Sequence, residues 1–556
     1  MTGNGASFPT LHDFLTQRLK RSIVRRLNNL KIDRVAREVT RSAPEPTGAP
    51  VVFFKASTGI DDLSWNSGFH LLASWALRLQ GISVAYFACR AGMSHCVLGT
   101  NRDDPHKPPP CKSCIYQAAT LYEDVPTSKH SNVGMPSTAL QWFTYHEEPA
   151  LVWVLENAKL SKLMDFQWQG MPLGPLCLPG LRWILRRHNL EDDEGTRYLL
   201  REYILSAWNV AREFSRFLDE IRPRAVVVFN GQFFPEAVAR YVAQKRGLRV
   251  ITHEVGLQPA SAFFTDGEAT AYPIHIPEDF ELNEQQNARL DAYLEKRFQG
   301  QFSMAGIKFW PEMKGLDRAF LDKAAGFKQI VPIFTNVIFD TSQPHANTVF
   351  KDMFAWLDSM LPIIRGHPET LFVIRAHPDE LRVRKASRET VAAWVEASRA
   401  NQDPNVVFVG PKESLSSYEL ITKSKFVMVY NSTIGLEASI MGMPVLCAGK
   451  ARFTQYPTVF FPQTVEGQRK ALAEFLNVEW IQVPAEFKRN ARRFLYYQLF
   501  RTSLPFGDFL TPSVRTTQTR LKSFDLDALS PAKSPAIKAI INGLLEGGDF
   551  LLEEES

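Results

Sequence analysis

The chain has 556 residues, of which 45% are hydrophobic and 22% charged, which is typical of a folded globular protein with room for two or more domains. Its net charge of +5 is too small over this length to indicate a nucleic-acid-binding protein. There is no run of about 18 apolar residues that would predict a membrane span, and the first residues lack the pattern of a signal peptide. We therefore expect a cytoplasmic protein with no nucleic-acid partner.

The first predicted element is a basic amphipathic helix within residues 1–45. Residues 11–41 contain nine Lys and Arg against three acidic residues, and apolar side chains recur at helical spacing at Leu11, Leu15, Leu19, Ile23, Leu27 and Leu30. Such a helix can lie on an anionic membrane surface, or it can dock on the body of its own protein. The first alternative would make the protein peripheral at the inner face of the cell membrane.

A first α/β domain, which would bind the acceptor of the reaction, is predicted for residues 50–256. Apolar strands are expected over 51–57, 81–88, 224–231 and 248–256, with helices between them. Loops at the carboxyl ends of parallel strands line the ligand crevice of an open sheet. Asp61 follows the first strand and Glu254 ends the last one, so both are candidate catalytic carboxylates.

Four cysteines occur in an insertion of this domain, residues 89–114. Cys89, Cys96, Cys111 and Cys114 include one CxxC pair. Four thiolates can hold a structural zinc ion in tetrahedral geometry, so the pattern predicts a possible zinc site. Buried free thiols and a redox pair are the alternatives.

A second α/β domain is predicted for residues 326–480, after a connecting region over 257–325. Strands at 329–336, 371–378, 405–410, 425–431 and 444–448 alternate with amphipathic helices, a pattern that favours a parallel, doubly wound sheet. Helices and an acidic tail are expected over 481–556. The predicted fold class is therefore α/β, with two Rossmann-like domains facing each other across a cleft.

The stretch from 425 to 448 has its polar residues where a strand passes into a helix. Ser432 and Thr433 stand at the predicted start of this helix, where backbone N–H groups and the helix dipole favour a phosphate. Gly435 would let a ligand approach the backbone, and Glu437, one turn further on, could accept hydrogen bonds from ribose hydroxyls. The alternative is that Ser432 and Thr433 are only helix caps.

Three more polar residues are predicted at the same edge of the second sheet. Arg375 and His377 end the strand at 371–378, and Lys450 follows the strand at 444–448. In a parallel sheet the carboxyl ends of all strands meet at one edge. We therefore expect Arg375, His377 and Lys450 to lie near Ser432 and Thr433.

The motifs RAHPDE at 375–380, YNSTIGLEA at 430–438 and GMPV at 442–445 resemble those of bacterial capsule and surface-polysaccharide glycosyltransferases of the two-domain GT-B type, including the Kdo-transferring group. In related enzymes that use CMP-sugars, an HP pair and a later Ser-Ser or Ser-Thr pair hold the donor phosphate. His377 with Pro378, and Ser432 with Thr433, match these motifs in order. The acidic base motif of the sialyltransferases has no secure match here.

The resemblance implies a nucleotide-sugar donor, linked to CMP, UDP or GDP, and a glycan or lipid-linked glycan acceptor, with no catalytic metal. The predicted function is transfer of the sugar to a surface or capsular polysaccharide. His377 would stabilise the departing phosphate, and Asp61 or Glu254 would take the proton of the acceptor hydroxyl. A nucleotide-sugar epimerase and a non-catalytic scaffold of polysaccharide assembly are the alternatives.

Overall fold

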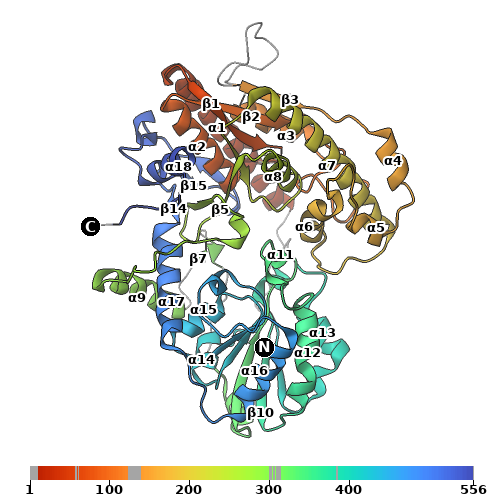
Figure 1. The fold of residues 1–556 in the computed structure, drawn as a ribbon, viewed down its shortest axis with the longest axis vertical. Helices are drawn as coiled ribbons and strands as arrows, with labels where there is room; N and C mark the ends of the chain where they lie inside the picture. Colours follow the sequence, from red (N-terminus) through yellow and green to blue (C-terminus); the bar gives the residue numbers. More distant parts are fainter. Residues whose placement is uncertain are drawn as a thin grey trace.

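The computed structural model describes residues 11–56, 59–60, 62–122, 139–299, 303–304, 307–308, 315–382 and 386–554. These residues form two α/β domains, one above the other in Figure 1. Each domain is built on a mainly parallel sheet that has a separate apolar core on each of its two faces. The predicted fold class, two Rossmann-like domains, is confirmed.

The first sheet has the strand order β14-β6-β5-β4-β1-β2-β3. Strands β5, β4, β1, β2 and β3 are parallel, with β3 at one edge, while β6 and β14 pair antiparallel at the other edge. Because helices cover both faces, the strands are rich in apolar residues, and Val52, Phe53 and Phe54 are fully buried. The strands are β1 (Thr47–Lys55), β2 (Ile82–Cys89), β3 (Ala139–Phe143), β4 (Ala225–Phe229), β5 (Arg249–Val255), β6 (Ser261–Thr265) and β14 (Leu504–Pro505).

The helices of the first domain divide between the two faces of this sheet. One face packs against α1 (Leu11–Ser42), α2 (Trp65–Leu79), α3 (Cys111–Tyr122) and α18 (Pro535–Glu546). The other face packs against α4 (Pro149–Leu155), α5 (Leu160–Met164), α6 (Leu173–Leu185), α7 (Glu194–Ile221) and α8 (Glu236–Lys245). The start of α7 has a local cause, since the side chain of Asp193 accepts a hydrogen bond from Thr196 N at 2.7 Å.

The second sheet is parallel throughout and has the order β11-β10-β9-β12-β13. Its strands are β9 (Gln329–Phe334), β10 (Thr370–Arg375), β11 (Val406–Val409), β12 (Val427–Val429) and β13 (Val445–Cys447). The helices of this domain are α10 (Arg318–Ala324), α11 (Gln343–Ala346), α12 (Met353–Arg365), α13 (Val391–Ser398), α14 (Ser417–Thr422), α15 (Ile434–Ile440) and α16 (Val465–Asn477). Strand β9 lies between β10 and β12, so the loops that follow these two strands open at the same edge.

The chain crosses between the domains twice. The first crossing follows β6 and includes α9 (Glu284–Phe298), β7 (Ser303–Met304) and β8 (Ile307–Lys308). The second follows α17 (Ala485–Tyr496) and a π-helical turn, Tyr497–Arg501 (Figure 1). Beyond it, β14 joins the first sheet, β15 (Leu510–Pro512) pairs with β16 (Thr519–Leu521), and α18 packs on α2. The C-terminal segment is therefore part of the first domain.

Short 3-10 helices complete the described structure at Ala269–Ala271, Pro378–Leu381, Ala400–Gln402, Arg452–Gln455 and Leu526–Leu529. A direct contact between the domains is made by Glu389. Its Oε2 accepts hydrogen bonds from His188 N at 2.7 Å and Asn189 N at 3.0 Å, and its Oε1 accepts one from Asn189 Nδ2 at 2.9 Å. Within the described parts of the chain, no helix is long and apolar enough to cross a membrane.

Candidate functional site

Two adjoining pockets open at the carboxyl edge of the second sheet. The inner pocket, with an empty volume of about 490 Å³, lies between the ends of β9, β10 and β12 and the helix α14. The interdomain cavity, of about 1710 Å³ including space open to solvent, lies between the second domain and Trp183 and Thr270 of the first. His377, Ser432 and Thr433 line both pockets. The structure thus brings together the two motifs that sequence reasoning placed at one sheet edge.

Arg375 is the last residue of β10 and lines the inner pocket. Its side chain is only 5% exposed, and its Nη1 has no hydrogen-bond partner among the described residues. Burial lowers the pKa of this guanidinium to about 10, with the nearby charge of Glu413 opposing the shift. Arg375 is therefore still cationic at neutral pH, and an anion in the pocket would satisfy its unpaired donor.

His377 stands two residues beyond β10, at the boundary of the two pockets. Its Nδ1 accepts a hydrogen bond from Asp379 N at 3.1 Å, so the neutral imidazole carries its proton on Nε2. Burial lowers the pKa of His377, the charges of Asp379 and Asp340 oppose that shift, and Arg375 adds to it. At neutral pH the ring is therefore a neutral donor through Nε2.

Ser432 and Thr433 occupy the loop between β12 and the seven-residue helix α15. Thr433 is the N-cap residue, yet its side chain makes no capping hydrogen bond. Both residues instead line the two pockets. The alternative interpretation, in which these hydroxyls serve only to cap the helix, does not apply to Thr433.

Gly435 has a packing role in the structure. A Cβ at this position would lie 2.9 Å from Val429 Cγ2 and 3.3 Å from Phe453 Cζ. The described residues that line the two pockets do not include it. The glycine therefore allows α15 to pack closely on β12 and Phe453, and ligand approach to its backbone stays a prediction.

Glu437 lines the inner pocket, but its carboxylate already has protein partners. Oε1 lies 2.8 Å from Arg297 Nε and 2.6 Å from Arg297 Nη2, and Oε2 accepts a hydrogen bond from the hydroxyl of Tyr418. Burial alone would lower the pKa of Arg297, but the charge and hydrogen bond of Glu437, together with Tyr293 and Tyr418, raise it overall. Glu437 thus holds Arg297 and Tyr418 in the pocket wall, and its expected role as a ribose acceptor stays a prediction.

Sequence reasoning did not identify Arg297 and Tyr418, and neither belongs to a recognisable motif. Arg297 lies on α9 in the first crossing between the domains, and Tyr418 lies in the first turn of α14. Lys450, in contrast, was predicted, and it lines the interdomain cavity together with Arg452.

The two carboxylates predicted in the first domain have different outcomes. Asp61 lies outside the described residues, so its role stays a prediction. The carboxylate of Glu254 accepts a hydrogen bond at Oε1 from Asn66 Nδ2, at 3.2 Å. Glu254 is not among the described residues that line the interdomain cavity. The carboxylates that do line this cavity are Asp340 and Asp379 of the second domain.

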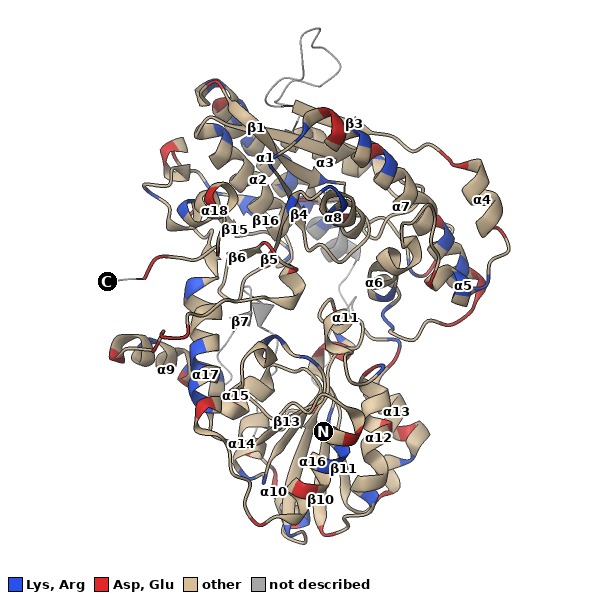
Figure 2. Cartoon of the chain, in the orientation of Figure 1, with Lys and Arg blue, Asp and Glu red and all other residues tan. Residues whose placement is uncertain are grey.

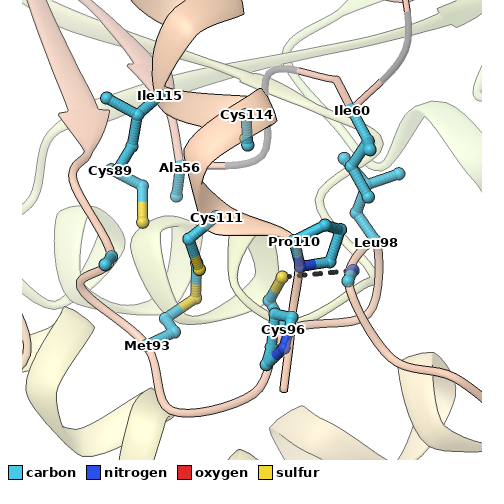
Figure 3. Close-up of a pocket in the computed structure, with 13 residues that line it drawn as sticks. Ala56, Ile60, Cys89, Met93, Cys96, Leu98, Pro110, Cys111, Cys114 and Ile115 are labelled. Carbon is cyan, nitrogen blue, oxygen red and sulfur yellow. Dashed lines mark hydrogen bonds between the residues drawn. The ribbon is translucent and has the colours of Figure 1, made fainter. Parts of the chain in front are cut away.

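The four cysteines of the insertion line one apolar cavity of about 400 Å³, together with Met93, Leu98 and Ile115 (Figure 3). All four are free thiols, and no three His, Cys, Asp or Glu side chains within the described ranges are arranged to hold a metal ion. Burial raises the pKa of Cys96 to about 12 and also raises that of Cys89.

Two of these thiols already have backbone partners. Gly92 N donates to Cys89 Sγ at 3.2 Å, and Gly99 N donates to Cys96 Sγ at 3.3 Å. The predicted zinc site is therefore corrected to an apolar cavity lined by free thiols.

Comparison with solved structures gives relatives of low similarity. KpsC from Thermosulfurimonas dismutans, a beta Kdo 2,4 transferase, is 11% identical with a TM-score of 0.34, over 55% of this chain and 87% of its own. MnaA from S. aureus, solved as a co-structure with UDP, is 12% identical with a TM-score of 0.25, over 63% of this chain and 83% of its own. UDP-GlcNAc 2-epimerase from Neisseria meningitidis is 12% identical with a TM-score of 0.21, over 81% and 98%.

No curated protein sequence matches the chain. A family model does match part of it. Residues 315–456 match the family described as capsule polysaccharide biosynthesis protein. The matched segment contains β9 to β13 and, with them, Arg375, His377, Ser432 and Thr433, so the similarity to this family falls on the domain that carries the inner pocket.

Proposed function

We propose that the chain is a glycosyltransferase that moves a sugar from a nucleotide-activated donor to a surface or capsular polysaccharide. The observation that carries this proposal is Arg375, a buried cation with an unsatisfied Nη1 beside His377 and Ser432 in the inner pocket. A buried unpaired cationic donor is costly unless an anionic ligand completes it. The phosphate of a nucleotide sugar is such a ligand.

The donor would extend through both pockets. His377, Ser432 and Thr433 belong to both linings, so a phosphate at their boundary would place the nucleoside in the inner pocket and the sugar in the interdomain cavity. Without the space open to solvent, this cavity has a volume of about 540 Å³, which lies within the roughly 300–1,000 Å³ of a typical small-molecule site. It therefore has room for the sugar, and an acceptor glycan would approach from the side that is open to solvent.

The chemistry requires stabilisation of a nucleotide phosphate that departs with additional negative charge. Nε2–H of His377 would donate to this phosphate, and the hydroxyls of Ser432 and Thr433 would add two further donors. Lys450, in the interdomain cavity, would contribute a second positive charge on the sugar side. Preorganised donors of this kind are each worth about 3 kcal/mol in the transition state.

The acceptor hydroxyl has to lose its proton during the transfer. Asp340 fits this role by location, because it is an exposed carboxylate in the wall of the interdomain cavity. Its Oδ1 accepts a hydrogen bond from Thr341 N at 2.9 Å, which orients the carboxylate. We propose Asp340 as the general base, with Asp61 and Glu254 as the alternatives that the sequence supplied.

The class of acceptor is supported by the family match. Its description, capsule polysaccharide biosynthesis, applies to residues 315–456, which include every residue proposed here to contact the donor phosphate. A glycan or lipid-linked glycan acceptor agrees with this description. The donor would be a CMP-, UDP- or GDP-linked sugar.

The proposal can be tested with a panel of CMP-, UDP- and GDP-linked sugars, each incubated with and without an acceptor glycan. Acceptor-dependent release of the nucleotide would support a transferase. Interconversion of the sugar without an acceptor would replace the proposal with an epimerase, and binding without turnover would replace it with a scaffold. Failure of all these donors to bind by calorimetry would remove the proposal entirely.

A further inference from the structure

Helix α1 changes its surroundings halfway along its length. From Asn28 onward one face is buried, with Ile32, Val35, Ala36 and Val39 packed in the core formed with α2 and α3. Asn28 anchors this half, because its Oδ1 accepts a hydrogen bond from Leu521 N at 2.9 Å. Over residues 18–27, in contrast, no side chain is buried. Arg21, Val24 and Arg25 are half-buried there, so residues 18–27 pack less closely on the first domain than the part of α1 from Asn28 onward.

The outer face of α1 is apolar where soluble proteins usually place polar residues. Leu19, Ile23, Leu27 and Leu30 are 64%, 51%, 61% and 59% exposed. Their spacing of four, four and three residues places them on one side of the helix, opposite the buried face. Four large aliphatic side chains aligned in this way form a continuous exposed patch, and such patches mark binding surfaces. We call these four residues the outer stripe.

The region that contains this helix accounts for the net positive charge of the chain. Residues 1–42 contain nine Lys and Arg and three acidic residues, a net charge of +6, while the full chain has a net charge of +5. The remaining residues together therefore carry a charge of −1, and their Lys and Arg are interspersed with Asp and Glu (Figure 2). Arg18, Lys20 and Arg26 are exposed on the same stretch of α1, and helical geometry places Lys20 and Arg26 at the two flanks of the outer stripe.

We propose that the outer stripe of α1 lies in the interface of an anionic membrane. The four aliphatic side chains would enter the boundary between headgroups and acyl chains, and Arg18, Lys20 and Arg26 would extend to the lipid phosphates. A second copy of the chain is a poorer occupant, because two helices of net charge +6 would repel each other. A nucleic acid would satisfy the charge but leave the stripe exposed.

This inference is independent of the proposed function, since it uses no residue of the two pockets. It assigns α1 as a reversible anchor, because none of the described helices is apolar enough to span a bilayer. Binding would depend on both the aliphatic stripe and the basic residues, so each can be removed separately.

The test is flotation of the full chain with vesicles made of an equal mixture of phosphatidylglycerol and phosphatidylcholine. We expect binding that pure phosphatidylcholine does not support and that high salt weakens. The variant Leu19→Ser/Ile23→Ser/Leu27→Ser should bind at least about 10-fold more weakly. The matched control is Trp480→Ser, which removes a larger apolar side chain that is 82% exposed elsewhere and should change nothing.

A second variant, Arg18→Gln/Lys20→Gln/Arg26→Gln, tests the charges and should also lose binding to the mixed vesicles. All substituted side chains are exposed, so thermal melting should match that of the unchanged protein. Equal vesicle binding by the aliphatic variant would overturn the inference, and so would equal binding to pure phosphatidylcholine. A change from dimer to monomer in the aliphatic variant, measured by analytical ultracentrifugation without lipid, would assign the stripe to a second copy instead.

Discussion

Arg297 and Glu437, 140 residues apart in the sequence, form a buried ion pair in the wall of the inner pocket, with Arg297 Nε 2.8 Å from Glu437 Oε1. The carboxylate also accepts a hydrogen bond from Tyr418. This pair joins α9 of the first crossing between the domains to α15 of the second domain. The wall of the pocket therefore depends on a segment outside the second sheet.

The first prediction is that Glu437→Ala destabilises the protein rather than only weakening ligand binding. The substitution leaves the buried charge of Arg297 without its partner, which typically costs about 3–5 kcal/mol. Urea unfolding measures this loss. The double variant Arg297→Met/Glu437→Gln should recover part of it, and Glu474→Ala, at an exposed position on α16, should have little effect. An unfolding curve for Glu437→Ala that matches the unchanged protein would contradict the role assigned to this pair.

The second prediction concerns Arg375 as the buried cation of the donor site. Arg375→Gln keeps a similar length but removes the charge, and hydrogen bonds to charged groups contribute about 1.5–3 kcal/mol. Nucleotide affinity should therefore fall by about 10- to 100-fold in calorimetry, at little cost in stability. The matched control is Arg365→Gln, which removes a partly exposed arginine of α12 paired with Asp403. If both variants bind nucleotide equally well, Arg375 does not contact the phosphate.

The third prediction is that His377 contributes more to turnover than Ser432 does. Removing the Nε2 donor with His377→Ala should lower turnover by roughly 100-fold or more. Ser432→Ala should have a smaller effect, because the hydroxyl of Thr433 remains beside it. The measurement is nucleotide release at saturating donor, with His367→Ala, near Glu369 on the same domain, as the control. Full activity of His377→Ala would rule out the proposed phosphate contact.

The fourth prediction is a pH-dependent stability that arises from Glu380. Its side chain is buried, its Oε2 has no partner among the described residues, and burial raises its pKa from 4.5 to about 7, although a hydrogen bond from Val391 N opposes the shift. The folded protein thus keeps a proton that the unfolded chain has already lost. This contribution to stability is complete below pH 4.5 and is lost as the pH rises through about 7.

Glu380→Gln removes this titration while keeping the size of the side chain. At a pH of about 8 the variant should be more stable than the unchanged protein by about 2–3 kcal/mol, and the difference should vanish near pH 4. Chemical denaturation across this range is the measurement. Glu396→Gln, at an exposed position on α13, should show no such gap. A pH-independent difference for Glu380→Gln would mean that the carboxyl group is not buried as described.

The arrangement of the second domain was predictable because it follows from local patterns and one general rule. The apolar runs before Arg375 and Ser432 identify two strands, and the rule that parallel strands share a carboxyl edge places His377 and Thr433 together. That prediction required no knowledge of the loops. The shared lining of the two pockets by His377, Ser432 and Thr433 confirms it.

What could not be predicted depends on contacts between distant parts of the chain. The spacing of Glu437 from the helix start suggested an acceptor for ribose hydroxyls, but it did not reveal the ion pair with Arg297, because Arg297 belongs to α9, which carries no motif. The spacing of Cys111 and Cys114 suggested a metal site, but spacing does not report the burial that keeps thiols protonated. Gly435 suggested ligand approach, although the side chain of Val429 explains it.

The return of the C-terminal segment to the first domain has a consequence for how the chain is synthesised. Strand β14 covers the edge of β6, and Ile537 and Ile540 of α18 are buried in the core beside Leu71 of α2. Domains usually fold in order as they leave the ribosome. Here the first domain leaves the ribosome early but stays incomplete, with one sheet edge and part of one apolar face uncovered, until β14 and α18 have been translated. The second domain, although it is made later, has all of its sheet available sooner.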